Sequence, residues 1–155
     1  MEISKLLKDS GNGILSDYAI DLLRDPYCYG FEESSNNSES MTCYIKGEDL
    51  HNLAVSQTKS FVSRSQLDDF EKIKLKRGDL VLSVRGYVGH VAVFNSDSGL
   101  PSPNVMAIRL NEKKIDPYFI ATYFNSSIGH SLVRRHVSGS VQETITSQDI
   151  KNIQC

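Results

Sequence analysis

The chain of 155 residues, 39% of them hydrophobic, can bury one core and is too short for two, so residues 1–155 are expected to form a single domain. No apolar run approaches a membrane span, and the opening residues MEISKLLKD lack the layout of a secretory signal, which predicts a cytoplasmic protein. Cys28, Cys43 and Cys155 have no C-x-x-C spacing, which argues against a disulfide framework and a structural zinc site, while the formal net charge of -2 argues against DNA binding by overall charge alone.

The amino-terminal half predicts short elements. Ser16 precedes Asp-Tyr-Ala-Ile-Asp-Leu-Leu and is a suitable cap for a short helix that Pro26 would stop. Residues 31–41 are polar with little to bury, so we expect a mobile loop there. Residues 42–46 alternate as in a strand, and residues 50–64 mix apolar and polar side chains as in edge strands and loops.

Two apolar runs flank a glycine-containing turn in the middle of the chain. Residues 79–84 and 88–94 are β-branched or apolar, which is typical of strands packed against a core. Gly86 and Gly89 interrupt them and predict a tight turn, because glycine tolerates positive φ angles. An ordinary hairpin would show the same pattern. Side chains able to donate hydrogen bonds to a ligand gather at this turn: Arg85, Tyr87 and His90.

The carboxy-terminal half predicts a strand followed by helices. Residues 95–104 read as a rigid, exposed connection, and residues 105–110 as a strand. Asp116 and Pro117 are a helix start signal, and Thr146 is placed to cap a last short turn. The side chains expected in the core of a first helix are Phe119, Ile120, Tyr123 and Phe124. Those expected on the inner side of a second helix are Ile128, Leu132 and Val133, with His130, Arg134 and Arg135 outside.

Several strands with clustered carboxy-terminal helices predict an α+β domain. We expect a strongly twisted, largely antiparallel β-sheet with the C-terminal helices packed to one side. The strand pattern alone does not distinguish such a sheet from a small barrel.

Four short segments follow one another in a characteristic order. They are YIKGEDL at 44–50, GDLVLSVRGYVG at 78–89, NVMAIRL at 104–110 and GSVQETITSQDIKNI at 139–153. Over residues 41–153 the chain resembles the target recognition domain of type I restriction-modification specificity subunits. The resemblance implies a DNA methylase specificity domain-like fold. It also implies recognition of a double-stranded DNA sequence, which directs adenine methylation and cleavage by partner subunits.

The resemblance divides the expected DNA-binding residues into two groups. Arginine can bind O6 and N7 of guanine, and Asn or Gln can bind N6 and N7 of adenine. The candidates for base contacts are Arg85, Asn104 and Gln142, with Tyr87 and His90 beside them. The candidates for phosphate contacts, which set register, are Lys46, Lys59, Arg64, Arg134, Arg135, Ser138, Gly139 and Ser140. A structural role competes with each assignment, since Asn104 can satisfy a turn, Gln142 can lie on a solvated strand and Arg85 can pair with a carboxylate.

No catalytic motif accompanies these segments. The sequence has no G-x-S-x-G elbow, no H-E-x-x-H pair and no Walker loop, so we expect no active site, no metal and no cofactor bound by this chain. The resemblance implies partners that carry the chemistry. Modification (methyltransferase) subunits would use S-adenosylmethionine, and restriction subunits would use ATP and magnesium.

The chain departs from the family pattern at its end. Family members usually carry two such domains and long helices, whereas this sequence has one domain, ends at Cys155 and has no heptad repeat. We therefore expect a fragment, an excised domain or a truncated gene product. Two alternatives stay open. One is the C-terminal recognition domain of a single-chain adenine-N6 DNA methyltransferase or methyltransferase-nuclease fusion. The other is a protein-interaction module that uses the glycine turn and Tyr87.

Overall fold

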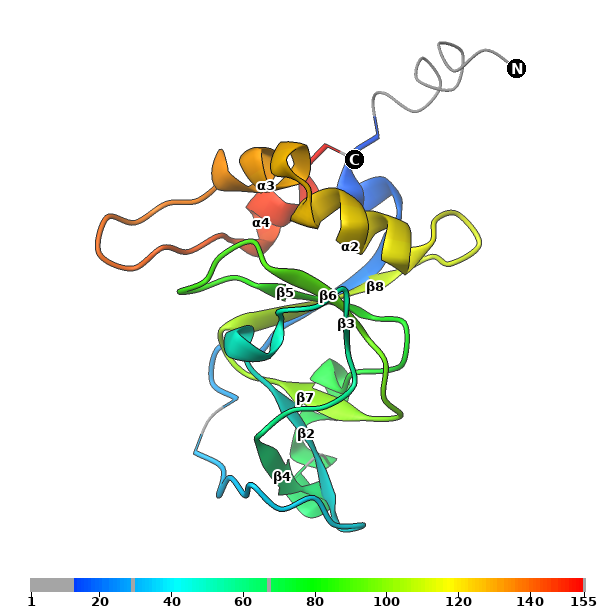
Figure 1. Cartoon of the computed structure of the whole chain (residues 1–155), viewed down its shortest axis with the longest axis vertical. Helices are drawn as coiled ribbons and strands as arrows, with labels where there is room; N and C mark the ends of the chain where they lie inside the picture. Colours follow the sequence, from blue (N-terminus) through cyan, green and yellow to red (C-terminus); the bar gives the residue numbers. More distant parts are fainter. Residues whose placement is uncertain (1–12, 29, 67, 155) are drawn as a thin grey trace.

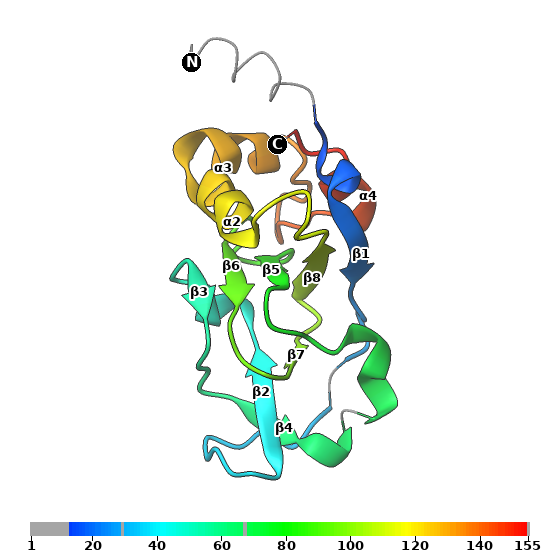
Figure 2. The ribbon, with the colours of Figure 1, turned by 90° about the vertical axis from the view of Figure 1, so that its right-hand side faces the viewer.

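The computed structural model describes residues 13–28, 30–66 and 68–154 (Figure 1). Cys155 and residues 1–12, which carry the prediction about a secretory signal, lie outside the described residues. The described residues form a layer of helices, a five-stranded sheet beneath it and a three-stranded sheet below that (Figures 1 and 2). The expected α+β class, with helices to one side of a largely antiparallel sheet, is confirmed.

The five-stranded sheet has the order β1-β8-β5-β6-β3. Its neighbours run antiparallel except for the parallel pair β3 and β6. In that order its strands are Ala19–Leu23, Val105–Leu110, Leu80–Ser83, Val91–Phe94 and Ala54–Val55. The sheet is open, with β1 and β3 as its outer strands.

The prediction of a helix after Ser16 is wrong. Leu15–Asp17 forms one 3-10 turn, η1, and the chain then enters strand β1. Leu22 pairs with Ile108 of β8, so the backbone groups of this segment are satisfied across strands that lie far apart in the sequence. Long-range pairing therefore overrides the local helix signal.

The three-stranded sheet has the order β4-β2-β7. Strand β2 (Met41–Ile45) is antiparallel to β4 (Phe61–Ser63) and parallel to β7 (Gly99–Pro101). The strand expected at 42–46 and the edge strands expected within 50–64 are confirmed. The prediction of a wholly exposed connection at 95–104 is wrong, because β7 is buried and pairs with β2.

Loops and 3-10 turns connect the two sheets. The turns are η2 (Gly47–Asp49), η3 (Arg64–Gln66) and η4 (Asp68–Ile73). The segment 31–41 is irregular up to the start of β2, and Ser34 exchanges two backbone hydrogen bonds with Phe61, of 2.9 and 2.8 Å. The mobility of this loop stays a prediction.

The five-stranded sheet buries both faces. Along β5, Leu80 and Leu82 join a core beneath the helices, whereas Val81 joins a second core that faces the three-stranded sheet. Strands covered on both sides read as continuous apolar runs, which explains the composition of residues 79–84 and 88–94. The buried Cys28 belongs to the second core, and burial raises the pKa of its thiol to about 12.

The helices α2 (Pro117–Asn125), α3 (Ser127–Arg134) and α4 (Ser147–Lys151) begin as the sequence predicts. The Asp116 carboxylate accepts the Tyr118 backbone N–H at 2.7 Å, and Thr146 forms a capping box with Asp149. None of the helices in the described residues is long and apolar enough to cross a lipid bilayer.

Two side chains expected in the core are exposed. Phe119 is 61% and Ile128 is 68% exposed. The buried face of α2 is formed instead by Ile120, Ala121 and Phe124. The neighbouring helix α3 contacts α2 at Gly129. The residue before it, Ile128, therefore lies on the outer side of α3.

Gly129 sets the distance between α2 and α3. A β-carbon at this position would lie 2.0 Å from the carbonyl oxygen of Tyr123 and 2.7 Å from the α-carbon of Phe124. Because both atoms belong to the backbone, Gly129→Ala must separate the helices, and we expect it to lower the free energy of unfolding by about 1–3 kcal/mol in urea titrations. Ser127→Ala, an exposed change on the same helix, should stay within about 0.5 kcal/mol of the parent. Equal stability of the two variants would contradict the close helix contact.

Candidate nucleic-acid interface

The turn between β5 and β6 is held rigidly. The Ser83 N–H donates to the His90 carbonyl at 2.9 Å, and the Gly89 N–H donates to the Ser83 carbonyl at 3.0 Å. Gly86 and Gly89 have φ angles of 79° and 98°, the left-handed region that favours glycine. The expected tight turn is confirmed, and it is anchored at both ends in buried strands.

The predicted donor side chains of this turn are exposed. The rings of Tyr87 and His90 meet edge to face, with centroids 6.3 Å apart. The Arg85 guanidinium makes no hydrogen bond or ion pair within the described part of the chain. The alternative that Arg85 pairs with a carboxylate is therefore not what the structure shows. Its donors face solvent.

Arg85 and Tyr87 line a cleft of about 450 Å³ together with Asn104 and Lys46. The Asn104 carbonyl accepts the Val84 N–H at 2.8 Å, while no hydrogen bond to its side-chain amide occurs among the described residues. The strand ends thus bring together residues that stand far apart in the sequence. His90 lies beside Tyr87 at a second, adjacent cavity.

The opposite wall of the cleft carries both signs of charge. The Lys46 ammonium donates to Glu33 at 2.6 Å, and Glu48 is a second acidic lining residue. The hydrogen bond from Lys46 lowers the pKa of Glu33, so the pair stays ionised. Lys46 remains accessible, with 30% of its side chain exposed.

A second loop lies beside this turn. Residues 138 and 144 exchange two backbone hydrogen bonds of 2.9 Å, and Arg85 forms a backbone bridge with Thr144. The two loops project on the same side of the molecule (Figure 1). Residues 138–142 are exposed, and the Gln142 amide makes no side-chain hydrogen bond within the described chain. The candidates on this loop are Ser138, Gly139, Ser140 and Gln142.

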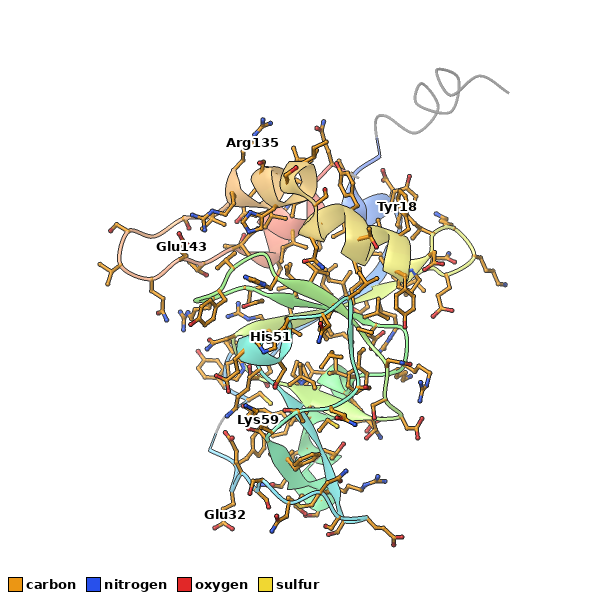
Figure 3. The ribbon with its side chains drawn as sticks, in the orientation of Figure 1. Tyr18, Glu32, His51, Lys59, Arg135 and Glu143 are labelled. Carbon is orange, nitrogen blue, oxygen red and sulfur yellow. The ribbon has the colours of Figure 1, made fainter. Side chains whose placement is uncertain are left out.

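The remaining candidates are not part of this cluster. Lys59 lies between β3 and β4 beside a separate cavity (Figure 3). Arg64 donates to the Met41 carbonyl at 3.0 Å. Arg135 follows α3 and points away from the sheets (Figure 3). Arg134 forms a two-pronged ion pair with Glu143, in which Nη2 donates at 2.7 Å.

Internal pairing also neutralises part of the positive charge in two runs of basic residues, at 72–77 and 134–136. The ion pair raises the pKa of Arg134 and lowers that of Glu143. In the cluster that precedes β5, Arg77 pairs with Asp97 at 2.9 Å and Lys74 with Glu71 at 3.3 Å. Sequence proximity of basic residues therefore overstates the free positive charge.

Sequence analysis missed Arg24. It follows β1, is partly buried, and its Nε donates to the Pro103 carbonyl at 3.0 Å. Burial, and secondarily the positive charge of Arg85, lower the pKa of Arg24. No local signal marks this residue, because the pairing of β1 with β8 brings it beside Pro103, which lines the cleft.

The five-stranded sheet is buried on both faces and presents donor side chains without internal partners from its turns, an arrangement suited to binding a ligand. The model of the type I restriction modification DNA specificity domain matches residues 29–154, and the chain belongs to this family. No curated protein is detectably similar to it.

Solved structures show the same fold. The HsdS subunit from Thermoanaerobacter tengcongensis has a TM-score of 0.59 at 17% identity over 90% of this chain and 30% of its own. A type I R-M system studied for its assembly and conformational transition gives a TM-score of 0.54 at 18% identity, covering 86% and 32%. The S subunit of a type I system from M. genitalium gives 0.54 at 16% identity, covering 91% and 32%. The chain thus spans about a third of these relatives.

Proposed function

We propose that this chain reads double-stranded DNA as the specificity component of a type I restriction-modification system. Family membership supports the class of function. The observation that carries the residue assignment is the set of unpaired side chains on neighbouring rigid segments: Arg85, Asn104 and Gln142. Side chains that lack an internal partner but extend from a hydrogen-bonded backbone can bind base edges without first breaking a native contact.

The chemistry of these groups specifies what they would contact. Arg85 offers a planar set of donors that matches O6 and N7 of guanine, and the amides of Asn104 and Gln142 match adenine. Each such pair supplies roughly 1–3 kcal/mol of discrimination against the wrong base. The exposed loop at 138–140 is the best placed of the phosphate candidates, whereas Lys46 would first have to leave Glu33 and Arg134 would have to leave Glu143.

The partner subunits belong to the same proposal. Modification subunits would methylate adenine with S-adenosylmethionine after flipping the base from the stack, and restriction subunits would use ATP and magnesium. This chain would supply the DNA sequence specificity and bind no cofactor itself. It would act in the cytoplasm, where these subunits meet cellular DNA.

Selection from random DNA tests the proposal. The purified domain is incubated with a randomised duplex pool at low salt, and the retained DNA is sequenced. We expect one short motif with at least one G·C pair. Retention without a motif would restrict this chain to phosphate binding, and absence of retention would remove autonomous DNA reading and favour the protein-interaction alternative.

Salt dependence separates DNA binding from an apolar protein contact. Each phosphate that is neutralised steepens the fall of log K with log salt by about 0.9. With two to four phosphate contacts, we expect a slope of roughly -2 to -4 for the selected duplex, measured by fluorescence anisotropy. An affinity independent of salt would contradict contacts between basic residues and the DNA backbone.

A further inference from the structure

Strands β1 and β5 end, and strand β8 begins, at the same end of the five-stranded sheet. Strand β8 pairs with both β1 and β5, with Leu23 opposite Ala107 and Ser83 opposite Val105. Arg24 follows β1 and Arg85 follows β5, so both lie next to the segment that enters β8. The two arginines therefore flank the Pro103 to Asn104 corner from opposite sides.

One hydrogen bond orients the Arg24 guanidinium, but most of its N–H donors have no partner among the described residues. The bond from its Nε to the Pro103 carbonyl fixes the plane of the guanidinium. Its two terminal amino groups make no hydrogen bond within the described part of the chain, and no carboxylate there forms an ion pair with it. Four N–H donors are thus left for a ligand.

Three of the other arginines have an acidic partner, whereas Arg24 and Arg64 each donate Nε to a backbone carbonyl. Arg77, Arg109 and Arg134 each contact a carboxylate. Arg24 instead stands close enough to Arg85 for the second positive charge to lower its pKa, in addition to the effect of burial. Two like charges held together at a partly buried site are stabilised when an anion joins them.

We propose that Arg24 binds the DNA phosphate next to the base that Arg85 reads, so that one nucleotide is held by its backbone and by its base edge. This inference rests on the proposed function. Arg24 lies outside the lining of the cleft that holds Arg85 and Asn104, but it bonds to the carbonyl of Pro103, which is part of that lining. A phosphate also relieves the repulsion between the arginines, which a neutral guanine would not do.

The test separates charge from structure with two variants. Arg24→Gln removes the charge and keeps an amide donor for the Pro103 carbonyl, whereas Arg24→Lys keeps the charge. We expect Arg24→Gln to weaken binding to the selected motif and to a scrambled duplex by a similar factor, roughly tenfold. Its salt slope should be shallower by about 1, while Arg24→Lys keeps most of the slope.

A modified duplex locates the contact. Replacing single phosphates of the selected motif with uncharged methylphosphonate should weaken binding of the parent protein at the phosphate beside the guanine. Arg24→Gln should be insensitive to that replacement. As a control, thermal unfolding of both variants is compared with that of the parent to check that each variant is folded.

Other results would overturn the inference. If Arg24→Gln relaxes the preference at one base pair and leaves the salt slope unchanged, Arg24 contacts a base. If both Arg24 variants bind like the parent while Arg85→Ala loses the motif, the bond to Pro103 is structural only and the proposed function stands. If the parent protein binds no DNA at low salt, both proposals fail together.

Discussion

Replacing Arg85 with alanine is expected to weaken binding to the selected duplex by about tenfold to a hundredfold, as loss of a two-pronged contact to guanine costs roughly 1–3 kcal/mol. The loss should be confined to one G·C pair, so that a second round of selection with the variant recovers the motif with that position degenerate. Stability should change by less than about 0.5 kcal/mol, because the side chain is exposed and makes no internal hydrogen bond.

Arg77→Ala is the matched control for this prediction. It removes the same charge from an exposed arginine, 57% of whose side chain is accessible, which pairs with Asp97 away from the cleft. We expect it to bind the motif nearly as the parent does. If Arg85→Ala instead weakens every duplex equally and lowers the salt slope, Arg85 holds a phosphate and the base assignment is wrong.

Replacing Asp79 with alanine is expected to lower the free energy of unfolding by about 3–5 kcal/mol, since it removes one partner of a buried ion pair. The Asp79 side chain is 3% exposed and accepts from Nε and Nη2 of Arg109 at 2.9 and 2.7 Å. It also accepts the Lys76 backbone N–H at 2.8 Å. The two bonds from Arg109 to Asp79 raise the pKa of Arg109, which stays charged and would lose its carboxylate partner. Urea titration measures the change.

An exposed pair serves as the comparison for Asp79. Asp97 pairs with Arg77 but is 96% exposed, so Asp97→Ala should alter stability by no more than about 1 kcal/mol. The double variant Asp79→Ala with Arg109→Met should recover part of the loss, because it leaves no uncompensated charge. A cost below about 1 kcal/mol for Asp79→Ala alone would mean that water solvates Arg109 in its place.

The features that could be predicted correctly from the sequence are those that depend on neighbours a few residues away. The turn at Gly86 and Gly89, the caps at Asp116 and Thr146, and the order of the family segments are local features, and each is present in the structure. Turn geometry and helix caps use hydrogen bonds between residues close in sequence, so composition and spacing are sufficient to predict them.

Elements that depend on distant partners could not be predicted from the sequence and follow from the packing of separate segments. Residues 19–23 and 99–101 became strands because β8 and β2 supply their hydrogen bonds. The same reason governs the candidate site. Strand pairing places Arg24 beside Pro103 of the cleft lining, and Arg134 loses its free charge to Glu143 across a loop. The spacing of residues in the sequence does not predict such contacts, because each contact depends on how separate segments pack.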